Sequence, residues 1–243
     1  MTINIPDREG FINNFLKPIS RFTEPAIFNV HGSLVTCLVS SIDNTTILYG
    51  EYNTGELAKT NETANIPNID KLISALKLVN SDSIELINNS NNMQYKSENM
   101  NFKFHTYEDG ILALPKLNVA KIKEFEYDTT FNMPASTVTQ LIKSSTFASE
   151  SNKVYFYSRD SKITAELTDR TTDNSDVFSF VVAEEFEGND ITEPIPLMLD
   201  SARSFSALNA DVNVHINNEF GVVKFEISTN QSKLMYIVTS IVA

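Results

Sequence analysis

The sequence of 243 residues has few of the residue types that build many common sites. Its single cysteine, Cys37, excludes an internal disulfide, and its three scattered histidines do not form a histidine-based zinc site. Seven glycines form neither a GxxxxGKS/T loop nor a GxGxxG turn, which argues against the common nucleotide-phosphate sites. Uninterrupted apolar runs are only a few residues long, far short of the ~18–20 that a membrane helix needs.

Targeting and catalytic signals are also missing. The segment 1–7 has neither a basic region nor an apolar core for secretion, so we expect a cytoplasmic protein, in the host cytoplasm if the chain is viral. The acidic run 184–190 has no nucleophile nearby and is interpreted as a solvated loop. We therefore expect no enzyme activity, no metal and no cofactor.

Acid predominates over base, with a formal charge of −12. The composition, 42% hydrophobic and 21% charged, is that of a folded protein with a real core. The length suits one large domain or two domains of about 120 residues. As a whole, such a chain should repel DNA.

Most of the sequence alternates apolar and polar residues, which predicts half-buried antiparallel strands. Clear examples are segments 34–39, 163–167, 212–216 and 222–227. Short clusters of Asn, Asp and Ser separate such segments and predict turns.

Four segments have helical spacing instead. They are about 7–22, with Pro18 expected to kink or shorten it, about 69–79, about 136–149, and a segment that we expect to begin at Pro196. The first and third helices, and the second and fourth, are each separated by about 127 residues. This fixed offset predicts two copies of one domain. We expect an N-terminal domain over 1–110, a connector over 111–134 and a C-terminal domain over 135–243.

The four helices differ in charge from the rest of the chain. Taken over 7–23, 69–79, 136–149 and 196–208, they contain seven Lys or Arg residues and four Asp or Glu residues, although the whole chain is acidic. Each helix presents at least one cation away from its apolar face. The predicted DNA-facing residues are Lys17, Arg21, Lys71, Lys77, Lys143 and Arg203. For any one helix, an ordinary solvated surface remains an alternative interpretation.

This layout resembles the DNA sliding clamps of the proliferating-cell-nuclear-antigen type, and most of all the clamp of T-even-type bacteriophages. The resemblance rests on three regions of the sequence: Leu76–Asp82 after the second helix, Gln140–Ser145 in the third, and Lys224–Glu226 with Tyr236–Val238 near the end. It covers nearly the whole chain as a pattern, with short literal matches. The chain departs from the family in length around 52–64 and in the connector.

The resemblance implies an α+β fold of two similar clamp domains, with antiparallel sheets outside and two helices per domain lining an inner face. It further implies a homotrimeric ring that encircles duplex DNA, is loaded by an ATP-driven clamp loader and tethers the replicative DNA polymerase. Late-transcription factors are additional partners that the resemblance suggests, and no membrane is involved.

In the family, a partner's peptide tail docks in a pocket beside the connector. The candidates here are Leu112, Leu114, Leu117 and Ile237, and the alternative is that they only anchor the connector and fill the core. Two other functions remain open: a β-rich virion or adhesion protein with two repeats, and a monomeric processivity subunit that binds DNA directly.

Overall fold

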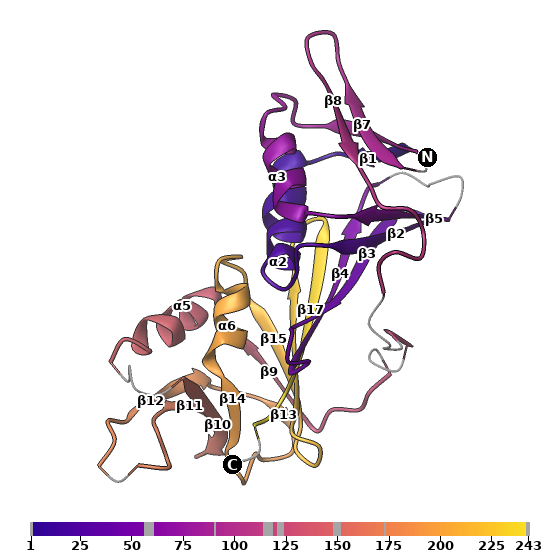
Figure 1. Ribbon diagram of the computed structural model, residues 1–243. Helices are drawn as coiled ribbons and strands as arrows, with labels where there is room; N and C mark the ends of the chain where they lie inside the picture. The colour runs from indigo at the N-terminus through magenta and orange to yellow at the C-terminus, as the bar shows by residue number, and fades with distance from the viewer. Residues whose placement is uncertain are drawn as a thin grey trace. The chain divides into compact units, whose positions relative to one another are not determined.

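The computed structural model describes residues 2–55, 61–89, 91–113, 119–120, 124–147, 152–172 and 174–241. These divide into two compact units, shown in Figure 1. Unit 1 comprises Met1–Asn118 and Thr229–Leu234, and unit 2 comprises Val119–Ser228 and Met235–Ala243. The chain therefore returns to unit 1 shortly before its end.

Unit 1 contains two helical segments that pack side by side and two antiparallel sheets. Its helical segments are α1 (Arg8–Phe11), η1 (Ile12–Leu16), α2 (Lys17–Ser20) and α3 (Ile69–Lys77). Its strands are β1 (Thr2–Ile5), β2 (Ala26–His31), β3 (Leu34–Ser40), β4 (Thr46–Asn53), β5 (Glu62–Ile66), β6 (Ile84–Asn89), β7 (Asn92–Lys96) and β8 (Asn101–His105). Neighbours run in the orders β1-β6-β7-β8 and β5-β2-β3-β4.

Unit 2 repeats this arrangement. Its helices are α5 (Ala135–Ser144) and α6 (Leu199–Ser206). Its strands are β9 (Thr129–Met133), β10 (Lys153–Arg159), β11 (Lys162–Leu167), β12 (Phe178–Ala183), the short β13 (Glu187–Gly188), β14 (Ile195–Met198), β15 (Val212–Asn217) and β16 (Val222–Ser228). The strand orders are β9-β15-β16-β17 and β14-β10-β11-β12, where β17 (Ser232–Thr239) begins in unit 1 and continues in unit 2.

The two units therefore share one topology. The first strand begins at Thr2 in one copy and at Thr129 in the other, which matches the expected offset of about 127 residues. The four segments predicted as strands coincide with β3, β11, β15 and β16. The repeat inferred from helix spacing is confirmed by the order of all these elements. Strand β9 lies at the end of the segment that we expected to be the connector.

The start of the last helix was predicted wrongly. Pro196 lies in β14, opposite Tyr155 of β10, and α6 begins three residues later at Leu199. Proline suits the first turn of a helix, but it also suits the outermost strand of a sheet, where its missing N–H is tolerated. Because β14 is such an outer strand, the second preference applies here.

Pro18 does not end the first helix. The helical run continues from Arg8 to Ser20 and includes a π-helical stretch over Ile12–Leu16, which ends two residues before Pro18. A proline inside an α-helix removes one backbone hydrogen bond and collides with the carbonyl four residues earlier. In the π turn, backbone hydrogen bonds join residues five apart instead of four apart. This local change is one way in which a helix accommodates a proline.

Aromatic side chains join helices to strands in each core. In unit 1, the Phe15 ring centroid lies 5.6 Å from that of Phe28 in β2 and 6.0 Å from that of Tyr52 in β4. In unit 2, Phe205 of α6 lies 4.9 Å from Phe225 of β16. These side chains are fully buried, and each contributes about 1.5–3 kcal/mol through removal of apolar surface from water. Each helix is thus held to its sheet by one apolar face, and its polar face remains exposed to solvent.

Candidate nucleic-acid interface

All six predicted DNA-facing cations are exposed on helical segments. Lys17 and Arg21 lie at the two ends of α2, Lys71 and Lys77 lie in the first and last turns of α3, Lys143 lies in the last turn of α5, and Arg203 lies in α6. Within unit 1, α2 packs against α3, and within unit 2, α5 packs against α6 (Figure 1). Each unit therefore presents cations from a pair of adjacent helices.

The sequence sets where these helices begin. The Asp7 carboxylate accepts a hydrogen bond from the Gly10 amide at 2.8 Å, and the Asn68 side-chain oxygen accepts one from the Lys71 amide at 2.7 Å. Both residues cap helix N-termini by satisfying amides that have no partner within the helix. In unit 2, Asp211 accepts from the Ala135 amide at 2.9 Å and serves the same purpose from outside the helix.

Lys17 is held in a short polar chain along its helix. Its ammonium donates to the Asn13 side-chain oxygen at 2.7 Å, and the Asn13 amide in turn donates to Glu9 at 3.4 Å. Because Asn13 is neutral, it orients the ammonium without cancelling its charge. Sequence reasoning missed Asn13, although its i,i+4 spacing from both neighbours was a usable signal.

Arg203 is held by three neighbouring side chains. Its guanidinium forms an ion pair with Asp200 at 2.7 Å and also donates to Ser145 and Asn152, at 3.2 and 3.3 Å. It therefore ties α6 to the end of α5. Hydrogen bonds from Asn152, and then from Arg203, lower the pKa of Asp200 below its usual value. A phosphate would have to compete with this carboxylate for Arg203.

Arg8 is a structural cation. It is 8% exposed, and its guanidinium donates to the carbonyls of Ser81 at 2.8 Å and Leu76 at 3.2 Å, at the C-terminal end of α3. A positive charge at this end is favoured by the helix dipole. Arg8 also forms an ion pair with Glu9 at 3.0 Å. The position of Arg8 on the apolar side of its helix was the sequence signal that set it apart from Lys17 and Arg21.

Unit 1 contains a hollow beside the residues that follow Gly110, which we call the smaller hollow. It has a volume of about 180 Å³ and is lined by Leu112 and Ala113, by Leu38–Ser40 of β3, and by Thr23 and Pro25–Ile27. Leu112, one of the four predicted pocket residues, therefore lines a partly apolar depression. Leu114 and Leu117 lie outside the described residues, and Ile237 is buried in β17 and does not line this hollow.

The described part of the chain contains neither a metal-binding cluster nor a membrane-spanning helix. Within the described part of the chain, no group of three or more His, Cys, Asp or Glu side chains could hold a metal ion. Among the helices that the structure describes, none combines the length and the apolar character needed to cross a bilayer.

Comparison with known proteins gives matches at the level of structure. No family model matches the sequence, and no curated protein sequence matches it. The A. fulgidus PCNA bound to the C-terminal region of FEN-1 is 14% identical, with a TM-score of 0.79, covering 100% of this chain and 98% of that chain.

Two further PCNA structures are similar over their whole length. The PCNA2-PCNA3 complex of Sulfolobus tokodaii is 12% identical with a TM-score of 0.75, and coverage is 99% of both chains. The Thermococcus kodakaraensis PCNA is 10% identical with a TM-score of 0.76, again with 99% of both chains covered. The chain therefore has the fold of the PCNA sliding clamps, and the predicted fold of two similar α+β clamp domains is confirmed.

Proposed function

We propose that this protein is a DNA polymerase processivity factor: a ring that encircles duplex DNA, slides along it without base specificity and has no chemistry of its own. The observation that carries the proposal is the placement of exposed cations on the paired helices of both units, in a chain whose net charge is −12 and whose fold is that of the sliding clamps.

A sliding protein should attract phosphates weakly and leave bases unread. Six dispersed Lys and Arg side chains suit this, because phosphate contacts carry no direct sequence information and their strength falls with salt. Screening limits the acidic remainder of the chain to a range of ~8–10 Å at physiological salt. The acidic surfaces therefore disfavour DNA where they face it, while a helix-lined hole remains attractive.

The repeat also supports ring formation. In unit 1, the first residues of β17 pair with β4. Strand β17 is the last strand of the second repeat, and β4 belongs to the first repeat. By position in the repeat, β8 of the first repeat corresponds to β17, and β12 of the second repeat corresponds to β4. Each of these two strands is the outermost described strand of its sheet. We propose that β8 of one copy pairs with β12 of the next, which makes a head-to-tail contact that closes into a ring.

Side chains at β12 suit such a contact. Phe147, Val177 and Val181 are 57%, 56% and 41% exposed, and the Phe178 ring lies 6.0 Å from Phe147 and 5.7 Å from Phe180. Because side chains alternate along a strand, Phe178 and Phe180 share one face of β12 with the nearby Phe147, whereas Val181 belongs to the other face. An apolar patch of this kind on an outer strand is costly to leave in water and indicates an interface. Three copies of a two-domain chain would give the six-domain ring of the resembling family.

The partners that we propose are the replicative DNA polymerase, an ATP-driven clamp loader and, for a chain of bacteriophage origin, late-transcription factors, all in the host cytoplasm. The smaller hollow beside Leu112 is the proposed site for a partner's peptide tail.

Leu112→Glu should weaken polymerase binding about tenfold or more, because a carboxylate would enter an apolar contact. Ile111→Glu is the matched control, since Ile111 is 60% exposed and does not line the hollow.

The proposal is tested by separating topology from affinity. Protein loaded onto a nicked DNA circle should remain bound after gel filtration and should be released when a restriction enzyme linearises the circle. Blocking both new ends with tightly bound proteins should restore retention. Equal retention on open linear DNA and on circles would show direct binding and would overturn encirclement.

A further inference from the structure

The helices of the two units differ in charge, although the units share one topology. In unit 1, the helical segments 8–21 and Ile69–Lys77 contain five Lys or Arg residues and two Asp or Glu residues. In unit 2, Ala135–Ser144 and Leu199–Ser206 contain two Lys or Arg residues and one Asp. The formal charge of the helices is therefore +3 in unit 1 and +1 in unit 2.

The acid of the first helical run of unit 1 is offset by a buried cation. Glu9 pairs with Arg8 at 3.0 Å, and Arg8 is only 8% exposed. Because a phosphate cannot reach this buried guanidinium, the pair leaves the exposed charges of the run unchanged. Lys17 is exposed and donates to the neutral Asn13, so it keeps its full charge.

The two lysines of α3 are also available to a phosphate. Lys71 and Lys77 are exposed, and neither forms an ion pair with a residue that the structure describes. Asp70 is next to Lys71 in the sequence, but side chains one position apart on a helix do not face each other. Asp70 lies in the first turn and Lys77 in the last, about 10 Å further along the axis. A phosphate can therefore meet either lysine without displacing a carboxylate.

In unit 2, one of the two cations is already occupied. The Arg203 guanidinium forms an ion pair with Asp200 at 2.7 Å, so the two charges nearly cancel at the distance of a DNA phosphate. Lys143 is the other cation of this unit's helices, and the remaining exposed residues of α5 are the neutral Ser136 and Gln140. The helix face of unit 2 is therefore only weakly charged.

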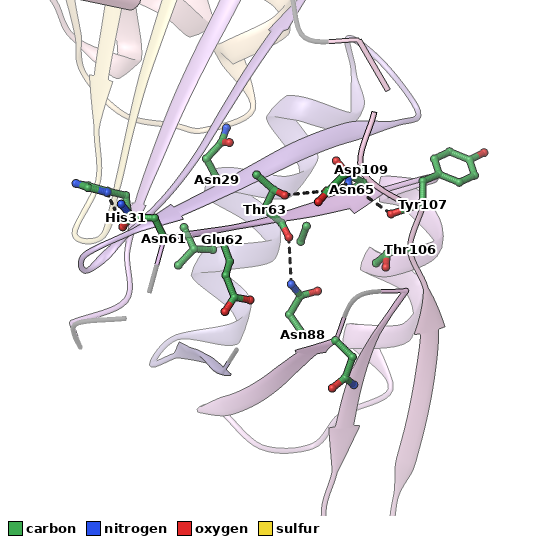
Figure 2. Close-up of a pocket in the computed structure, with 13 residues that line it drawn as sticks. Asn29, His31, Asn61, Glu62, Thr63, Asn65, Asn88, Thr106, Tyr107 and Asp109 are labelled. Carbon is green, nitrogen blue, oxygen red and sulfur yellow. Dashed lines mark hydrogen bonds between the residues drawn. The ribbon is translucent and has the colours of Figure 1, made fainter. Parts of the chain in front are cut away.

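A second hollow in unit 1, the larger hollow, does not add to the attraction for DNA. It has a volume of about 830 Å³ and is formed by β2, β5, the end of β6 and residues 106–109 (Figure 2). Its described lining includes the carboxylates of Glu62 and Asp109 and no Lys or Arg. Asp109 accepts hydrogen bonds from the Asn65 side-chain amide at 2.8 Å and from the Thr63 hydroxyl at 3.1 Å, as Figure 2 shows. Such a lining disfavours phosphates, in contrast to the helix face of the same unit.

We propose that the helix face of unit 1 is the part of each chain that holds the phosphates of duplex DNA, and that the helix face of unit 2 is a weakly charged surface past which the duplex slides. This inference rests on the proposed clamp function and names the unit through which DNA is attracted. In a ring of such chains joined head to tail, attracting and weakly charged faces alternate.

Two double variants with the same change in charge compare the units. Lys71→Gln with Lys77→Gln acts on unit 1, and Lys143→Gln with Arg203→Gln acts on unit 2. Fluorescence anisotropy of the full chain with a short DNA duplex, at several salt concentrations, gives the slope of log affinity against log salt. Each phosphate that is no longer neutralised makes this slope shallower by about 0.9. The unit 1 variant should lose about twice as much slope as the unit 2 variant, because Arg203 contributes little. Circular dichroism checks that both variants fold.

A second comparison asks why unit 2 is weak. Asp200→Asn removes the carboxylate that holds Arg203 and should make the slope steeper, by up to about 0.9 for each phosphate that Arg203 then meets. Asp70→Asn makes the same charge change on a helix of unit 1. Because Asp70 forms no ion pair with a described residue, this control should leave the slope unchanged.

The outcomes separate this inference from the clamp function. Equal losses of slope in the two double variants would overturn the inference and leave encirclement standing, because retention on a DNA circle does not depend on which unit attracts the duplex. An unchanged slope for Asp200→Asn would overturn the explanation of the weak face of unit 2. Failure of the unaltered protein to remain on DNA circles would overturn the clamp function and this inference with it.

Discussion

At the scale of single residues, Arg8 and Arg203 have different roles. Arg8 is buried and bonded to carbonyls at the end of α3, whereas Arg203 is exposed and paired with Asp200. Removing Arg8 takes a charged donor away from the Ser81 and Leu76 carbonyls, and the loss of hydrogen bonds to a charged group is costly. Removing the Asp200 charge instead leaves Arg203 with its neutral partners Ser145 and Asn152.

The first residue-scale prediction concerns Arg8. Arg8→Met keeps most of the apolar stem and should lower the free energy of unfolding by about 2–3 kcal/mol, because two hydrogen bonds from a charged donor are lost. Urea unfolding followed by circular dichroism measures this. Lys71→Met, on the exposed face of α3, should change stability by no more than about 0.5 kcal/mol. Similar losses for both variants would contradict a structural role for Arg8.

The second concerns Asp200 and pH. The pKa of Asp200 is lowered in the folded state, so the stability that its charge contributes is present above the unfolded pKa of about 3.9 and is lost as pH falls through the folded pKa. Asp200→Asn should therefore be less stable than the unaltered protein at pH 7, and this difference should shrink below about pH 4. Thermal unfolding across this range tests it, with Glu98→Gln as control for the loss of one carboxylate. A difference independent of pH would contradict the assignment.

Asp200→Asn also bears on DNA. Freed of its ion pair, Arg203 should be easier for a phosphate to recruit, so DNA affinity at low salt should rise slightly. Lower affinity would show that the Asp200 contact positions Arg203 for DNA.

At the scale of elements, the two prolines show how far the sequence could predict the fold. The helical and strand periods predicted that four helical segments exist and how they repeat, because burial of one face imposes these periods, but they did not fix every helix end. Pro196 was misassigned because its local preference fits two positions, and only the pairing of β14 with β10 decides between them. The π turn before Pro18 was equally hidden, because no residue pattern in the sequence marks it.

The candidate sites were predicted unevenly for the same reason. The exposed cations follow from helical periodicity, which a sequence displays directly. The Ser145 and Asn152 contacts of Arg203, the lining of the hollows and the outer position of β12 depend on residues far apart in the chain. No local pattern reports such contacts.

The element-scale prediction concerns β12. Val181→Lys places a charge on this outer strand and should block the proposed pairing with β8, so that light scattering at micromolar concentration gives the mass of a single chain. Ile87→Lys is the matched control, because Ile87 has a similar exposure of 39% but lies in β6, a central strand. An unchanged oligomer mass for Val181→Lys would contradict the β8–β12 contact, and a monomeric unaltered protein would contradict the ring itself.

At the scale of the whole molecule, the charge separation should appear in the salt dependence of DNA binding. Replacing Lys17 and Lys143 with Gln should make the plot of log affinity against log salt shallower by about 0.9 for each phosphate that the protein no longer neutralises. Fluorescence anisotropy with duplex DNA at several salt concentrations measures the slope. Lys96→Gln with Arg159→Gln removes the same charge from exposed strand residues and should leave the slope unchanged. Equal changes in both double variants would contradict the helix-face assignment.

The division of β17 between the units has a consequence for how the protein is made. In unit 1, the Asn53 amide donates to the Gln231 carbonyl at 2.7 Å, and the Tyr52 hydroxyl lies 2.8 Å from the Gln231 side chain, 179 positions along the chain. A ribosome adds about 5–20 residues per second, so the edge of β4 that pairs with β17 stays unpaired for many seconds after β4 is synthesised. During that interval a nascent chain exposes an unpaired strand edge, and neighbouring chains on one messenger could exchange their final strands before each chain receives its own.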